Sequence, residues 1–118
     1  MFYIAWILTL GVAALHGHIL WLEMVEWERP RTRKIFGITP EFAFDSKALA
    51  ANMGLYNGFL AVGLLLGLLT GASGRDLVYY LLACILVAGV YGGVTVNLRI
   101  LFAQATPALI ALLAWWVA

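Results

Sequence analysis

Four long apolar runs separated by short polar joints divide the chain. About 20 apolar helical residues cross a bilayer core of about 30 Å, and each run has roughly that length. The second run begins at Thr39-Pro40-Glu41, which is typical of a helix N-terminus, and ends at the turn-forming Gly71-Ala72-Ser73-Gly74. The pattern predicts an all-α fold, a four-transmembrane-helix bundle in one integral membrane domain (residues 1–118). We expect its helices at about 2–24, 40–70, 76–95 and 99–117.

The composition supports a membrane protein. Of the 118 residues, 64% are hydrophobic and 11% are charged, whereas soluble domains are about 45 to 50% apolar. The single cysteine, Cys84, lies inside an apolar run, so neither a disulfide nor a cysteine metal site is expected. We predict no metal site, and no motif identifies a cofactor.

Basic residues are distributed unevenly among the joints. Six of the seven flank the first and third joints, and only Arg75 lies in the second. Because cytoplasmic loops of membrane proteins carry the excess of Lys and Arg, we expect the segment 26–47 to be cytoplasmic and both termini to be outside. This predicts a multi-pass protein of the cell inner (cytoplasmic) membrane. The basic joint is interpreted as a topology signal that attracts anionic lipid, not as a nucleic-acid site.

The second run combines small residues with amides. Small residues at four-residue steps allow a neighbouring helix to approach closely, and this run carries Gly54, Gly58, Gly63, Gly67 and Gly71. Burying an unpaired amide costs about 2 to 7 kcal/mol, so we expect Asn52 or Asn57 to form a hydrogen bond with a different helix.

Polar residues of all four helices are expected at similar depth in the cytoplasmic half of the membrane. His16 lies on one helical face with Glu23, whereas His18 points about 200° away, which argues against a metal clamp. The predicted ligand-binding residues are His16, Asn52, Tyr56, Asn57 and Gln104, and the candidate catalytic residues are His16, Glu23 and Tyr56. An intramembrane ionisable group is by default a candidate site. The alternatives are a buried histidine that simply hydrogen-bonds an amide, and acids at 23, 26 and 28 that form interfacial salt bridges.

Several motifs together resemble one family. They are His16, Leu22-Glu23-Met24 with Trp27, Arg33-Lys34-Ile35-Phe36-Gly37, the block Leu49-Ala50-Ala51-Asn52-Met53-Gly54-Leu55-Tyr56-Asn57-Gly58, Tyr91-Gly92, Gln104 and Pro107. Over nearly the whole chain the sequence is similar to small bacterial membrane proteins of domain of unknown function 1304. Members usually have Gln where this chain has Met53. The resemblance implies a four-helix membrane fold, and it does not indicate which activity the protein has.

Three functional classes fit these observations. A cytoplasm-facing intramembrane pocket suits a protein that binds a lipophilic small molecule with a polar head. An intramembrane acid/base enzyme, such as an isomerase or hydrolase of a lipophilic substrate, is the alternative. A small transporter acting as an oligomer ranks third, because the outer half offers no polar path. The expected partners are membrane lipid and a lipophilic small molecule, and no nucleic acid is expected. The sequence leaves open whether the protein forms a homo-oligomer.

Overall fold

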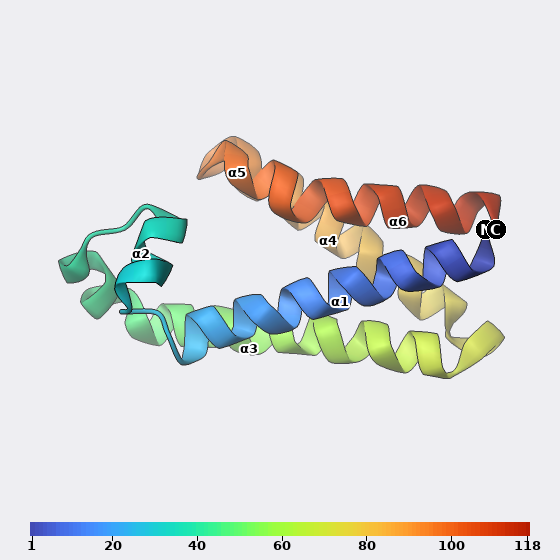
Figure 1. Cartoon of the computed structure of the whole chain (residues 1–118), viewed down its shortest axis with the longest axis horizontal. Coiled ribbons are helices and arrows are strands. Elements are labelled where there is room, and N and C mark those ends of the chain that lie inside the picture. Colours follow the sequence, from blue (N-terminus) through green and yellow to red (C-terminus); the bar gives the residue numbers. More distant parts are fainter. The chain divides into compact units, whose positions relative to one another are not determined.

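The computed structural model describes residues 1–118, and its regular structure is entirely helical (Figure 1). The elements are α1 (Phe2–Met24), α2 (Pro30–Phe36), α3 (Pro40–Leu69), the 3₁₀ turn η1 (Gly71–Gly74), α4 (Arg75–Thr95), α5 (Leu98–Ile100), the π-helix η2 (Leu101–Ala105) and α6 (Thr106–Val117). Four helical segments, at 2–24, 40–69, 71–95 and 98–117, are long and apolar enough to cross a membrane. The predicted all-α fold with four such helices is confirmed.

Local side-chain chemistry fixes several helix ends. Thr39 Oγ1 accepts a hydrogen bond from the backbone N–H of Phe42 at 3.1 Å, which caps α3 as its sequence predicts. Asn97 Oδ1 accepts from the backbone N–H of Arg99 at 2.9 Å and starts the last helical segment in the same way. The polar joints therefore define the borders of the apolar helices.

Helix α2, in the first joint, was not predicted. It begins with Pro30 in its first turn and ends at Gly37, whose φ of 68° is the left-handed conformation that glycine adopts most readily. The ring of Phe36 packs edge-on against Trp27 with centroids 4.9 Å apart. With only 7 residues and a basic composition, α2 has too little apolar periodicity to be recognised in the sequence.

The last membrane-length segment is not one regular α-helix. Pro107 lies in the first turn of α6 and has no backbone N–H to donate. The five residues immediately before α6 form the π-helix η2, and the N–H of Thr106 bonds to the carbonyl of Leu101. The irregular turn thus lies where the proline would interrupt a regular ladder of hydrogen bonds.

The chain divides into two compact units, with the divisions inside α1 and α3. Unit 1 contains Met1–Ala13 and Val62–Ala118. Both chain termini lie at the same end of this unit (Figure 1), where the Phe2 ring meets Trp115 edge-on at 5.7 Å. Trp115 Nε1 donates a buried hydrogen bond to Thr9 Oγ1 at 2.8 Å, and this bond ties α6 to the start of α1.

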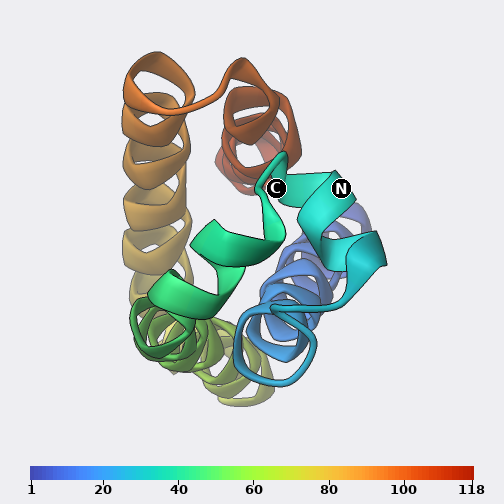
Figure 2. The same cartoon turned by 90° about the vertical axis from the view of Figure 1, so that its left-hand side faces the viewer.

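Close backbone approach organises the packing of α4 within unit 1. A Cβ atom at Gly89 would lie 2.5 Å from the backbone nitrogen of Ala105, and one at Gly93 would lie 2.7 Å from Leu101 Cβ. Figure 2 accordingly shows α4 beside the segment that contains η2 and α6. Glycine is needed at these positions because any side chain would push the two elements apart.

Unit 2, Ala14–Ala61, contains the end of α1, the first joint with α2 and residues 40–61 of α3. A Cβ at Gly54 would lie 2.6 Å from Met24 Cγ, and one at Gly58 would lie 2.5 Å from Leu20 Cδ1. The expected close approach of another helix to this glycine pair is therefore confirmed, and the neighbour is α1. In Figure 2 the α2 end of this unit is nearest the viewer.

Candidate functional site

A side-chain hydrogen bond between Glu23 and Asn57 joins α1 to α3 within unit 2. Asn57 Nδ2, on α3, donates to Glu23 Oε1, on α1, at 2.7 Å, and it also contacts the carbonyl of Met53 at 3.1 Å. This confirms the prediction that one of the two amides bonds to a different helix. Glu23 is only 5% exposed, and its second oxygen, Oε2, has no hydrogen-bond partner within the chain. The carboxylate can therefore accept a further donor.

The other predicted site residues have different surroundings. His16 is fully buried on the same helix as Glu23, whereas His18 is exposed, so the two histidines do face different ways. Asn52 is exposed and donates to the carbonyl of Ala48 in its own helix at 2.9 Å. Tyr56 is 65% exposed.

Gln104 belongs to the π-helix of unit 1, whereas the other four predicted ligand-binding residues belong to unit 2. None of the five lines the cavity that the structure places beside Glu23. A ligand-binding or catalytic role for His16, Asn52, Tyr56 and Gln104 stays a prediction.

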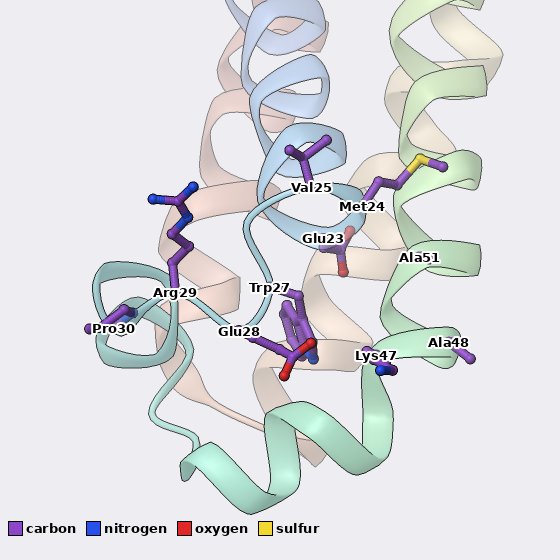
Figure 3. Close-up of a pocket in the computed structure, with 10 residues that line it drawn as sticks. All are labelled: Glu23, Met24, Val25, Trp27, Glu28, Arg29, Pro30, Lys47, Ala48 and Ala51. Carbon is purple, nitrogen blue, oxygen red and sulfur yellow. The ribbon is translucent and has the colours of Figure 1, made fainter.

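A cavity of about 640 Å³ lies at the end of α1, between the first joint and α3 (Figure 3). Its walls are formed by Glu23, Met24, Val25, Trp27, Glu28, Arg29, Pro30, Lys47, Ala48 and Ala51. Figure 3 shows the carboxylates of Glu23 and Glu28 and the Trp27 ring on the side of the joint that faces Lys47 of α3. The Arg29 guanidinium is turned to the other side of the joint. The wall is thus partly apolar and carries charges of both signs.

Most of these charged groups have no ionic partner within the chain. The structure contains a single ion pair, between Arg31 Nη2 and Glu26 Oε2 at 3.4 Å. The expected interfacial salt-bridging of the acids at 23, 26 and 28 is therefore limited to one of them. Lys47 Nζ lies 4.3 Å from the centre of the Phe44 ring, a cation–π contact, and it pairs with no carboxylate. Glu28 and Lys47 can consequently both bind an external group.

Trp27 forms a fixed wall of the cavity. Its Nε1 donates to Ser46 Oγ at 3.1 Å, and Ser46 in turn donates to the carbonyl of Phe42 at 2.6 Å. Together with the edge contact to Phe36, these bonds hold the indole between the first joint and the start of α3. A rigid aromatic wall reduces the ordering cost of binding.

From the sequence, Glu28 is expected in an interfacial salt bridge, and neither Trp27 nor Lys47 is among the predicted site residues. A usable signal was present, since Lys47, Ala51, Gly54 and Gly58 follow one another at steps of four, three and four and so share one face of α3. The glycine pair that packs on α1 therefore implies that Lys47 also lies on the side of α1. What the sequence does not show is the path of the first joint, which brings Glu28 to the same space.

A second cavity, of about 360 Å³, lies in unit 1. Its lining is mainly apolar and includes Phe2, Trp6 and Trp115, with Arg75 as its one charged residue. The Arg75 guanidinium stacks 5.1 Å from the Trp115 ring centre and is held at the wall. No group of three or more His, Cys, Asp or Glu side chains in the chain is placed to hold a metal ion.

Comparison with known proteins assigns the chain to a family. The model of the family described as protein of unknown function (DUF1304) matches residues 10–116. The chain belongs to this family. A relative, "Uncharacterized protein YpaA" of Lactococcus lactis subsp. lactis (strain IL1403), is 30% identical over 109 residues, which are 91% of this chain and 92% of that protein. No solved structure matches the chain. The matched region includes the Glu23–Asn57 pair and the whole cavity beside it, so the site lies within the family's own region.

Proposed function

We propose that this DUF1304 protein is a multi-pass protein of the inner membrane that binds a lipophilic small molecule with a polar head. The binding site is the cavity beside Glu23, at the cytoplasmic end of α1. The observation that carries the proposal is the open carboxylate oxygen of the buried Glu23, together with unpaired Glu28 and Lys47 on the wall of the same cavity. A polar head bound there would donate to the carboxylates and accept from the ammonium, and so would supply ionic partners that these groups lack within the chain.

The position of the cavity favours an amphiphilic ligand. Glu23 is the penultimate residue of a 23-residue apolar helix, so the cavity lies where such a helix leaves the hydrocarbon. Beside it, Met24 and Val25 are 44% and 57% exposed, and Phe42 and Phe44 at the start of α3 are 55% and 57% exposed. Exposed apolar and aromatic side chains of this kind are suited to the membrane interface. A ligand can therefore place its polar head in the cavity and its apolar part against the helices.

Native mass spectrometry tests the proposal. The protein, purified from membranes in a mild detergent, should retain a stoichiometric amphiphile, and Glu28→Gln with Lys47→Gln should lose it while the melting temperature stays close to that of the unmodified protein. The double variant Glu41→Gln with Lys34→Gln is the matched control, because it removes the same two charges from exposed residues that do not line the cavity. Equal retention by both double variants would contradict the proposal.

Acid/base catalysis is the second candidate, because Glu23 is a buried acid on the wall of a cavity. An enzyme would convert the retained molecule, so extracts incubated with the protein should show a product that is absent with Glu23→Gln. Retention without conversion would favour the binding function.

A further inference from the structure

We propose that the polar head bound in the cavity beside Glu23 is zwitterionic, with a primary ammonium and a phosphate, as in an aminophospholipid of the membrane. This inference rests on the proposed function and specifies its ligand class. In the bound state the ammonium lies between the carboxylates of Glu23 and Glu28, and the phosphate lies at Lys47. The site therefore recognises two opposite charges in one head.

The carboxylate side of the cavity is suited to a group that donates hydrogen bonds. Asn57 occupies Oε1 of Glu23 and orients the carboxylate, which leaves Oε2 as a fixed acceptor. Glu28 adds a second acceptor that has no ion pair, although its backbone carbonyl accepts from Arg33 Nε at 3.2 Å. A primary ammonium has three N–H donors and can bond to both carboxylates, whereas a quaternary ammonium has none. Trp27 provides an aromatic wall beside the same space.

The cationic side is suited to a phosphate. Lys47 lies on the α3 wall and has no carboxylate partner. Its contact with the Phe44 ring keeps the side chain near the interface without neutralising the charge. A compact ammonium is a common phosphate ligand. The Arg29 guanidinium is turned to the other side of the joint (Figure 3), so the proposal does not require it.

The charge distribution argues against the other common classes of lipid head. A purely anionic head would bring its phosphate against two carboxylates, and like charges at close range repel each other. A neutral head would leave both carboxylates and the ammonium without an ionic partner. A zwitterion gives a partner to both signs at once. The cavity volume of about 640 Å³ lies within the usual range of ligand sites, about 300 to 1,000 Å³.

The test compares lipids that share their acyl chains and differ only in the head. The delipidated protein is incubated in detergent with equimolar phosphatidylethanolamine, phosphatidylcholine, phosphatidylglycerol and diacylglycerol, and bound lipid is measured by native mass spectrometry. We expect the amount of bound phosphatidylethanolamine to exceed that of each other lipid about tenfold. This ratio corresponds to roughly one additional charge-assisted hydrogen bond. Glu28→Gln should reduce the preference over phosphatidylcholine, and Lys47→Gln the preference over diacylglycerol. Glu41→Gln and Lys34→Gln should leave both preferences unchanged.

Each contrary outcome has a distinct meaning. Equal retention of phosphatidylglycerol or diacylglycerol, with stoichiometric binding that depends on Glu28 and Lys47, would overturn the zwitterion and leave the proposed function intact. If millimolar phosphoethanolamine without acyl chains displaces the bound lipid, the ligand is a soluble molecule with this head, and the assignment to a membrane lipid is overturned. Retention of no amphiphile by a folded protein would overturn both proposals. Because Glu28 and Lys47 lie at the surface of the joint and of α3, thermal melts should show that both variants remain folded.

Discussion

Asn57 and Glu23 are joined by one side-chain hydrogen bond between two helices, and this bond serves both packing and the site. The amide supplies a donor to an almost fully buried carboxylate and fixes the direction of its free oxygen. An ionised acceptor gains more from a donor than a neutral one does. The same residue pair therefore holds α1 against α3 and orients the acidic wall of the cavity.

Asn57→Leu should lower the free energy of unfolding by about 1 to 2 kcal/mol, because it leaves the Glu23 carboxylate without its donor. Glu23→Gln should cost less, since the new amide oxygen can still accept from Asn57. Unfolding by sodium dodecyl sulfate in mixed micelles would measure both effects. A larger loss for Glu23→Gln than for Asn57→Leu would show that the negative charge, and not the hydrogen bond, stabilises this helix pair.

The buried bond between Thr9 and Trp115 gives a second prediction at this scale. Thr9→Val removes the acceptor of the indole N–H while conserving side-chain volume, and we expect a loss of about 1 kcal/mol in unfolding free energy. Thr95→Val is the matched control, because the hydroxyl of Thr95 is exposed and bonds only to the carbonyl of Tyr91 in its own helix. Similar melting shifts for the two variants would contradict an interhelical role for Thr9.

At the scale of elements, the glycines of α3 pack against two different helices. Gly54 and Gly58 meet α1 within unit 2, whereas Gly63 meets Leu81 and Gly67 meets Val78 of α4 within unit 1. The change of neighbour has a simple origin. Gly58 and Gly63 are five residues apart, and five helical steps turn the face by about 140°. The spacing of the glycines therefore distributes the contacts of α3 between two neighbours.

The same reasoning predicts opposite signs for two glycine substitutions. Gly89→Ala would place a methyl group 2.5 Å from a backbone nitrogen of η2, which cannot rotate away, and should destabilise the protein by about 1 to 3 kcal/mol. Gly17→Ala meets nothing within 4 Å and should stabilise α1 by about 0.5 to 1 kcal/mol, because alanine is the better helix former. Thermal melts of the two variants would measure both signs, and a neutral Gly89→Ala would show that α4 and η2 can separate at little cost.

At the scale of the whole molecule, both termini and the η1 turn belong to one end of unit 1, since Phe2, Gly71 and Trp115 line the same small cavity. Which side of the membrane they face stays a prediction, based on the excess of basic residues in the first and third joints.

Cysteine labelling in intact cells would determine that orientation. In a Cys84→Ala background, Ser73→Cys should react with a membrane-impermeant maleimide from outside, whereas Ile35→Cys should react only after the membrane is permeabilised. Both positions are exposed, whereas Thr32 in the same joint is fully buried and would label poorly. Labelling of Ile35→Cys from outside would invert the topology and place the proposed site in the other leaflet.

The sequence by itself determined the four membrane-length helices, the helix start at Thr39 and the shared face of α1 that carries His16 and Glu23. These features depend on local periodicity and on hydrogen bonds a few residues apart, which one sequence displays directly. The glycine pair at 54 and 58 was predictable for the same reason, since its spacing indicates a close neighbour, although not which one.

Only the tertiary structure decided which residues form a cavity. Asn52 and Asn57 are both amides of the same apolar run, yet one bonds to its own helix and the other reaches Glu23. The first joint contains the unpredicted helix α2, and its path places Glu28 on the wall of the same cavity as Lys47 of α3. Such groupings depend on the rotation of each helix about its axis and on the turns of short joints. Many weak contacts fix these together, and no short stretch of sequence specifies them.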